Sequence, residues 1–332
     1  MTDLRDEFPL VSVGLPIYNG EATITRAIES ILRQDYPNIE LVISDNGSTD
    51  KTYEILVNLY EQSPNIRIHR SLVNRGWTWN ANRVFSLSHG EFFLWSAHDD
   101  FYEKSFISSA IQQLKLYPMA VMCHPKTKAV IDGGTESLWH SGLESFKGLT
   151  TVQQRYSETL NNFPAVAFYG VYRSRILREI GTLTEIVGAD VVFIQKLSLY
   201  GNFCDTESEL FTRIARPLWN TRKQNITSYL GYSRKLSRLS LRLEMFNQRA
   251  LDIQNSPHSS LTKVHLVFIA ATFEIRSIVV KYLVRLIVRA TPKWFTRRVS
   301  IFLYMHFLQN SNVIPEDFDL YYSRIIAPSL TH

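Results

Sequence analysis

The chain has 332 residues, of which 45% are hydrophobic, enough for one large or two ordinary domains with a well-formed core. Its two cysteines, Cys123 and Cys204, cannot form a disulfide framework, and the polar start MTDLRDEF has no apolar signal region. These features argue against a secreted, disulfide-rich protein and favour a cytoplasmic one.

The net charge of +5 is unevenly distributed along the chain. Residues 231–300 contain thirteen lysines and arginines but only three acids, so this segment carries +10 and the remainder −5. The basic segment therefore requires an explanation separate from that of the rest of the chain.

The first expected unit is a strand, a helix and a second strand. Alternating apolar residues from Val11 to Leu15 predict a strand that leads into a turn over residues 16–20, and apolar residues at helical spacing up to Leu32 predict a helix. Residues 39–43 predict the second strand, and the polar loop SDNGSTD over residues 44–50 follows it. Because ligands bind beyond the carboxyl ends of strands in open parallel sheets, these two loops predict a binding site.

The alternation of strands and helices continues toward the C-terminus. Residues 66–69, 91–95 and 120–124 predict three more strands, and the second of these ends in the polar stretch SAHDD. Residues 163–201 follow the pattern strand, turn, helix, loop, helix. The sequence therefore predicts an α/β fold with a Rossmann-type, mostly parallel sheet flanked by helices.

Acidic residues end or interrupt apolar segments at four positions: Asp45, Asp50, Asp99–Asp100 and Asp190. Carboxylates in such places are costly unless they are paired, hydrogen-bonded or bound to a cation. Two adjacent carboxylates directly after the strand EFFLW are typical of a site for Mg²⁺ or Mn²⁺ beside a phosphate. Simpler explanations stay open, because Asp99 or Asp190 could cap a helix and Asp45 could be a turn residue.

Several other functions lack support in the sequence. It contains no glycine-rich dinucleotide fingerprint, P-loop, zinc spacing or serine-hydrolase elbow. A nucleotidyltransferase also places carboxylates on a metal beside a nucleotide, but the expected phosphate loop near the N-terminus is missing. Packing explains three tryptophans, Trp77, Trp79 and Trp95, better than stacking on nucleic-acid bases does.

Four segments taken in chain order resemble the family 2 glycosyltransferases, nucleotide-sugar enzymes with a GT-A fold. They are VSVGLPIYNGEATITRAIESIL, ELVISDNGSTDKT, NRGWTWNANRVFSLSHGEFFLWSAHDD, and FYGVYRSRILREIG with GADVVFIQKLSLYG. The resemblance covers residues 10–215. It implies a GT-A-like catalytic domain over residues 1–225, followed by a basic, mainly helical region over residues 226–332.

The resemblance implies roles in binding the nucleotide. Pro16 and Tyr18 would border the nucleobase, Asp45 would hydrogen-bond to it, and Gly76 would let the backbone approach it. The donor would be a nucleotide-diphosphate sugar, and the acceptor a hydroxyl group of a polysaccharide or a lipid-linked glycan.

The resemblance also implies the chemistry. Asp99 and Asp100 would bind the ribose and a divalent metal, Mg²⁺ or Mn²⁺, on the diphosphate, and Asp190 would be the general base of an inverting transfer. Two positions depart from the family pattern, because Ala97 replaces a common aspartate and Ala215 a common histidine. These departures leave open a catalytically inactive relative that serves as a nucleotide-sugar sensor or scaffold.

Residues 261–290 predict a long helix in which Lys281, Arg285 and Arg289 recur every four positions among apolar residues. Charges interrupt it too often for a normal membrane-spanning helix. It is either an appendage packed on the catalytic domain or a helix attached to the anionic inner face of the plasma membrane, where each Lys or Arg contributes on the order of 1 kcal/mol. No nucleic-acid partner is expected, because no recognition motif accompanies the charge.

Overall fold

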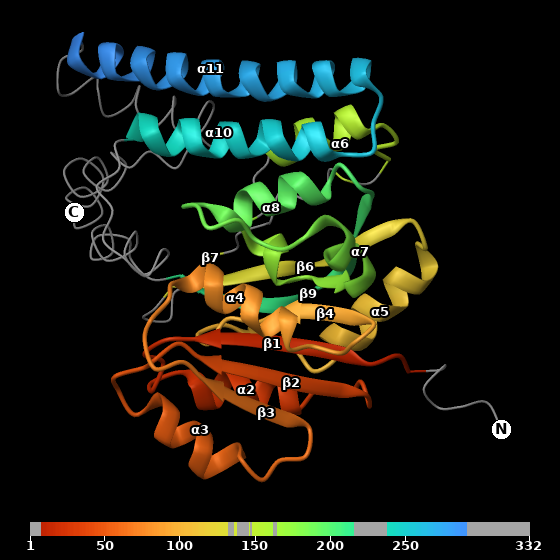
Figure 1. Cartoon of the computed structure of the whole chain (residues 1–332), viewed down its shortest axis with the longest axis vertical. Coiled ribbons are helices and arrows are strands. Elements are labelled where there is room, and N and C mark those ends of the chain that lie inside the picture. The colour runs from red at the N-terminus through yellow and green to blue at the C-terminus, as the bar shows by residue number, and fades with distance from the viewer. Residues whose placement is uncertain are drawn as a thin grey trace.

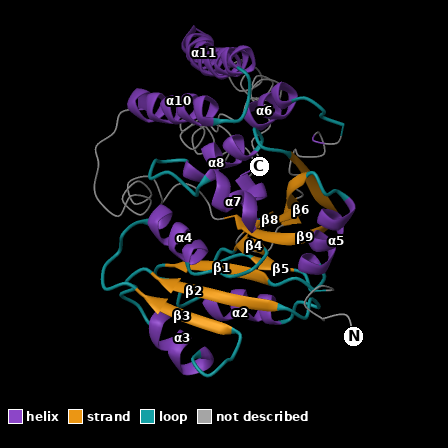
Figure 2. Ribbon diagram, turned by 45° about the vertical axis from the view of Figure 1, so that its right-hand side comes forward, coloured by secondary structure: helices purple, strands orange, loops and turns teal. Residues whose placement is uncertain are grey.

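The computed structural model of the chain describes residues 8–131, 136, 137, 146, 148–161, 165–215 and 238–290. These residues form a central sheet with the strand order β3-β2-β1-β4-β8-β6-β9-β5, and β7 pairs with β6. Helices cover both faces of the sheet, and α10 and α11 form a further layer at one side (Figure 1 and Figure 2). The expected α/β architecture is confirmed.

Four parallel strands form the first half of the sheet. They are β1 (Val11–Ile17), β2 (Ile39–Asp45), β3 (Ile66–Arg70) and β4 (Phe92–Trp95), and the helices that connect them are α2 (Ile24–Leu32), α3 (Thr52–Tyr60) and α4 (Trp77–Ser86). The sequence predicted all of them but was wrong about Pro16, which lies inside β1 opposite Ser44 and not in the turn. The proline is tolerated there because β4 pairs with β1 only as far as Gly14.

The second half of the sheet is mixed. Its strands are β5 (Phe101–Tyr102), β6 (Ala120–Ile131), β7 (Glu136–Ser137), β8 (Val171–Arg173) and β9 (Asn202–Ala215); its helices are α5 (Phe106–Leu116), α6 (Val152–Asn161), η2 (Ala165–Tyr169), α7 (Ser174–Ile180) and α8 (Ala189–Leu197). The strand β8 runs antiparallel to both β4 and β6, whereas β6 and β9 are parallel. The strand expected at the start of residues 163–201 is wrong for residues 165–169, which form the 3₁₀ helix η2, and the short β8 follows.

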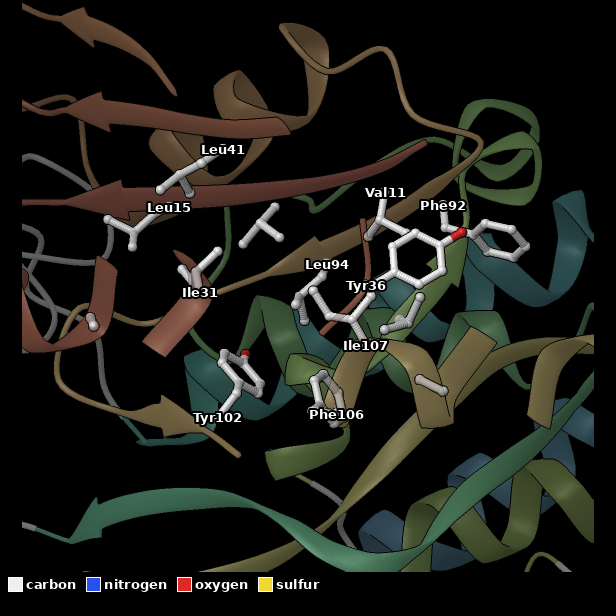
Figure 3. Close-up of a cluster of buried hydrophobic side chains, with 14 of the residues drawn as sticks. Val11, Leu15, Ile31, Tyr36, Leu41, Phe92, Leu94, Tyr102, Phe106 and Ile107 are labelled. Carbon is white, nitrogen blue, oxygen red and sulfur yellow. The ribbon is translucent and has the colours of Figure 1, made fainter. Parts of the chain in front are cut away.

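Two apolar cores form because successive strand residues point to opposite faces of the sheet. On one face, Val11, Val13 and Leu15 of β1 pack with α2, α3 and α5 (Figure 3). On the other face, Phe93 and Trp95 of β4 pack with α4, α7 and α8. The first core joins β1 with β4 through Phe92 and Leu94, and the second core takes its β4 residues from the opposite face, so β4 is held from both sides.

A polar cluster joins the four parallel strands at their amino-terminal end. Glu40 of β2 accepts hydrogen bonds from the Ser12 hydroxyl of β1 (2.5 Å) and the Arg67 guanidinium of β3 (2.8 Å), and also from the His89 N–H just before β4 (2.7 Å). Burial opposes ionisation of Glu40, but these hydrogen bonds and the Arg67 charge outweigh it and lower the pKa of its carboxyl group.

The helix α10 (Arg238–Asn255) packs on α8, and α11 (Ser260–Ala290) packs on α6 and on α10. The buried Arg249 donates to Gln195 of α8 (2.7 Å) and also binds Glu274 of α11. The predicted long helix is thus confirmed and packs as an appendage, while the expected boundary between residues 225 and 226 lies outside the described residues. No helix in the described part of the chain combines the length and apolarity needed to cross a bilayer.

Replacing Glu40 with glutamine is expected to lower the free energy of unfolding at neutral pH by about 1–3 kcal/mol, because an NH₂ group takes the place of one carboxylate oxygen. Either Arg67, or Ser12 and His89, then face a donor instead of an acceptor. The folded-state pKa lies below the ordinary value of 4.5, so Glu40 stabilises the protein above that pH and ceases to do so as the pH falls through the folded-state pKa. In denaturation series from pH 7 to pH 3, the difference between wild type and Glu40→Gln should therefore shrink below pH 4.5.

The matched control is Glu29→Gln, which removes an exposed ion pair with Arg33 on α2. It should change stability by less than about 1 kcal/mol at every pH. An equal effect of the two substitutions, or a difference independent of pH, would contradict the role given to Glu40.

Candidate functional site

The loops that follow β1, β2, β3 and β4 meet at the carboxyl-terminal end of the parallel strands. The N–H of Asn46, directly after β2, donates to the carbonyl of Ile17 at the end of β1 (2.8 Å). The N–H of Ser71, directly after β3, donates to the carbonyl of Asp45 (2.8 Å). The sequence placed a binding site at this end of the sheet, and all four loops lie there.

The side chain of Asn46 holds the loop that follows β3. Its amide donates to Asn74 Oδ1 and to the Gly76 carbonyl, both at 3.0 Å, and its carbonyl oxygen accepts the N–H of Arg75 at 3.0 Å. The side chain is buried, so these bonds replace solvent that cannot reach it. Nearby, the buried Asn80 of α4 donates to the Ser44 carbonyl (2.8 Å), which ties α4 to the same strand end.

Asp45 lies at the floor of the site and is fully buried. One carboxylate oxygen accepts the N–H of Ser48 (3.0 Å), the geometry of the turn expected from the sequence. The other oxygen lies 3.2 Å from Arg70 Nε, an ion-pair distance, but accepts no well-aligned hydrogen bond. A buried oxygen with a free lone pair can accept a hydrogen bond from a bound molecule.

The loops after β1 and β2 are locked to each other. Asp50 accepts from the N–H and the hydroxyl of Thr52 and from the N–H of Glu21 (3.2 Å), while the Thr52 hydroxyl accepts the Gly20 N–H (2.8 Å). Although partial burial opposes it, this set of hydrogen bonds lowers the pKa of Asp50. Tyr18 is left exposed at the rim, next to the half-buried Pro16.

Gly76 adopts a backbone conformation that only glycine reaches without strain, with φ 89° and ψ 159°. It precedes α4, and its carbonyl accepts both the Asn46 amide and the N–H of Asn80. The glycine is buried and has no Cβ, so the expected close approach of the backbone to a ligand is compatible with its geometry.

Asp99 and Asp100 follow β4 in a short bend before β5. Asp100 is buried and Asp99 is half-buried, and the Asp99 carbonyl accepts a hydrogen bond from Arg26 (3.2 Å). The explanation that Asp99 caps a helix is wrong, because β5 comes next and α5 begins only at Phe106.

The same two aspartates have the right chemistry for a divalent cation. Mg²⁺ is usually bound by one or two carboxylates together with substrate phosphates, and a pair of adjacent carboxylates fits that pattern. Among the described residues no group of three or more acidic, histidine or cysteine side chains gathers around one point. A metal here would accordingly take its remaining ligands from a bound phosphate and water.

Two buried tyrosines are influenced by the charges of the aspartates, Tyr102 by Asp100 and Tyr172 by Asp190. Tyr102 donates to the Trp95 carbonyl (3.2 Å), and Tyr172 donates to the Phe168 carbonyl (2.8 Å). Burial raises the pKa of both phenols well above the usual value, with further contributions from the charge of Asp100 at Tyr102 and of Asp190 at Tyr172. Both phenols therefore stay neutral at physiological pH.

Asp190 lies in the first turn of α8 and is half-buried. The simpler explanation that it caps this helix is wrong, because the N-cap is Gly188. A carboxylate in the first turn of a helix interacts favourably with the helix dipole.

The sequence identified the acidic residues of the site but missed the amides and phenols that organise it. Asn46 was quoted only as part of a polar loop, and Asn80, Tyr102 and Tyr172 had no motif around them. Polar residues next to apolar ones in β2 and α4 were the available signal. Ala97 is half-buried beside the aspartates, whereas the side chain of Ala215 is not among those described.

Comparison with known proteins gives a consistent result. The family model described as glycosyl transferase family 2 matches residues 12–181. An uncharacterised glycosyltransferase of Haemophilus influenzae is 34% identical over 93 residues, 28% of this chain and 37% of that protein. Chondroitin synthase of Escherichia coli is 32% identical over 124 residues, 37% of this chain and 18% of that protein. The chain thus matches well under half the length of these relatives.

Solved structures extend the similarity to most of the chain. Residues 1–349 of TarS from S. aureus superpose with a TM-score of 0.58 and 21% identity, covering 79% of this chain and 70% of that one. The same protein in complex with UDP gives a TM-score of 0.57 with 22% identity, over 78% and 69% of the two chains. At this identity the likeness shows the fold, which is the GT-A fold expected from the sequence.

Replacing Asn46 tests how the loops are held. Asn46→Asp is nearly isosteric, but its carboxylate would face two acceptors, Asn74 Oδ1 and the Gly76 carbonyl, and lose both donors. We expect Asn46→Asp to destabilise the protein by about 1–3 kcal/mol or more, at least as much as Asn46→Ala, in chemical denaturation at neutral pH. If Asn46→Asp is as stable as wild type, the amide does not hold the loop.

Proposed function

Because the chain belongs to glycosyl transferase family 2, we propose that it transfers a sugar from a nucleotide-diphosphate sugar to a hydroxyl group of a glycan. The observation that carries this proposal is the meeting of the loops after β1–β4 around Asp45 and Asp99–Asp100, inside the segment that the family model matches. Chondroitin synthase among the relatives supports a hexose or hexosamine as the sugar transferred.

We propose that the nucleoside of the donor lies between the loops after β1, β2 and β3. The free lone pair on buried Asp45 can accept an N–H of the base, Pro16 and Tyr18 border the base at the rim, and Gly76 admits the backbone next to it. A uridine nucleotide is the first candidate, because structures of TarS hold UDP and UDP-GlcNAc.

Asp99 and Asp100 are proposed to hold the ribose and a Mg²⁺ or Mn²⁺ ion. Asp99 is the more accessible of the two, while Asp100 is enclosed beside Tyr102. When bound, such an ion stabilises the negative charge that develops on the departing diphosphate. Ala97 removes one carboxylate that many relatives carry, so among the described residues these two aspartates are the ligands that we propose.

Asp190 is the proposed general base. An inverting transfer requires one base on the side opposite the leaving group, where it takes the proton of the attacking hydroxyl. Asp190 meets the chemical requirements, because it is a half-buried carboxylate in the first turn of a helix whose other face is buried in the core. The alternative, an inactive relative that only senses the nucleotide sugar, predicts donor binding without turnover.

The acceptor is proposed to be a growing polysaccharide or a lipid-linked glycan. The concentration of positive charge in residues 231–300 supports a location on the cytoplasmic side, in peripheral contact with the anionic inner face of the plasma membrane.

A thermal-shift panel tests the donor and the metal together. With UDP-, GDP-, dTDP- and CMP-sugars, one nucleotide class should raise the stability only with Mn²⁺ or Mg²⁺ present, by about 2.7 kcal/mol at a ligand concentration of one hundred times Kd. Asp99→Ala/Asp100→Ala should lose the metal-dependent part. Absence of a shift with every donor would contradict nucleotide-sugar binding.

The substitution Asp190→Asn distinguishes an active glycosyltransferase from an inactive nucleotide-sugar sensor. The amide keeps the shape of the side chain but cannot take a proton, so kcat should fall by about 10²–10⁴-fold while the donor-induced thermal shift is unchanged. Transfer would be followed as release of the nucleotide diphosphate with glycan acceptors. Unchanged kcat would remove Asp190 from the base role, and no turnover by the wild type with any acceptor would favour the sensor.

A further inference from the structure

The long helix α11 carries apolar side chains on both its inner and its outer face. Its inner face buries Leu266 and Ala270 against α10 and α6. Its outer face exposes a row of apolar side chains, here called the α11 stripe: Leu261, Val264, Phe268, Ile275, Ile278 and Val279. The first four of these are 62–81% exposed, because α11 is the outermost helix of the layer that it forms with α10 and no described element covers this face (Figure 1).

The spacing of the stripe makes it continuous. Its members follow one another at intervals of three, four or seven residues, with one single step, and such intervals place side chains on one side of a helix. The helix has 31 residues and is therefore ~46 Å long. Contiguous exposed apolar surface of this kind marks a contact site for a protein or a membrane.

A shallow pocket lies beside the amino-terminal part of the α11 stripe. A cavity of about 460 Å³ lies between α11 and Gln153 of α6, and its apolar wall is made by Leu261, Val264 and Phe268. This volume is within the range of sites for small organic molecules. Its wall is almost wholly hydrocarbon, so it suits a hydrocarbon chain better than a sugar or a nucleotide.

The charges on α11 indicate the sign of the partner. Its one acidic residue, Glu274, is turned inward and held by Arg242 (3.1 Å) and by the buried Arg249. Every other formally charged residue of this helix in the sequence is basic: Lys263, Arg276, Lys281, Arg285 and Arg289. Apart from the inward Glu274, α11 thus combines hydrocarbon with positive charge.

We propose that the α11 stripe docks on an anionic lipid bilayer, with the helix lying in the plane of the interface and its apolar side chains entering the outer acyl region. This inference rests on the peripheral membrane contact proposed above and names the surface that makes it. A helix with an apolar face and basic residues takes this position because hydrocarbon burial and attraction to anionic headgroups act together. A second copy of the chain is a poorer partner, because two strongly basic helices repel each other.

Vesicle sedimentation of the full chain tests the proposal. Wild type should sediment with vesicles of equal parts phosphatidylglycerol and phosphatidylcholine, and weakly with phosphatidylcholine alone. Val264→Ser/Phe268→Ser should bind the anionic vesicles at least about tenfold more weakly, because both side chains leave hydrocarbon. Both positions are 67–68% exposed in solution, so the variant should keep the melting temperature and the UDP-induced thermal shift of wild type.

Two further variants sharpen the result. Leu59→Ser/Leu116→Ser removes two comparably exposed apolar side chains, at 56% and 64%, from α3 and α5, and should sediment like wild type. Arg285→Glu/Arg289→Glu should lose binding at low salt, whereas the contribution of Val264 and Phe268 should persist at high salt because apolar burial is not screened.

Three results would overturn the proposal. Wild type could fail to sediment with anionic vesicles while its UDP-induced shift is intact, which leaves the proposed enzyme standing without this surface. Val264→Ser/Phe268→Ser could bind as wild type does. Wild type could also run as a dimer in size-exclusion chromatography and this variant as a monomer, which would assign the stripe to a second copy.

Discussion

Parallel strands cannot be joined by tight hairpins, so the loops at their carboxyl ends must be held by other means. In this chain the side chain of Asn46 supplies much of that hold, because it donates two hydrogen bonds to the loop after β3 and accepts one from it. The floor formed by Asp45, the glycine conformation at residue 76 and the start of α4 all depend on the position of that loop. A single buried amide therefore sets the shape of the surface on which a nucleoside is proposed to lie.

The first half of the sheet could be predicted because its signals are local. The apolar residues of β1 alternate and those of β2 and β4 are consecutive, and α2 and α3 begin seven positions after the ends of β1 and β2. The second half depends on distant partners instead. The strand β8 has only three residues and exists because β4 and β6 flank it, while β9 pairs with β6 through several irregularities in register. A short stretch of sequence does not reveal which distant strands it will pair with or in what register.

The site shows the same division. Aspartates at the ends of apolar strands can be recognised in the sequence, because a carboxylate next to buried residues is costly unless it is paired or bound to a ligand. The residues around them carry no such signal, since Asn46 acquires its role from residues 74–76 and Tyr172 of β8 is influenced by an aspartate on α8. The sequence supplied the proposed reactive groups through a family resemblance, whereas the supporting contacts required the folded chain.

The contact between α10 and α8 bears on how this protein can be divided. The family model ends at residue 181, yet α8 carries Asp190, and its outer surface is closed by Arg249 and Asp252, the latter 3.7 Å from Lys196. Met245 of α10 also lies against Gly188, two residues before Asp190. Recombination between relatives that exchanged only the matched segment would separate a helix from the surface that covers it. The unit that can be inherited or transplanted intact is consequently larger than the unit that sequence comparison recognises.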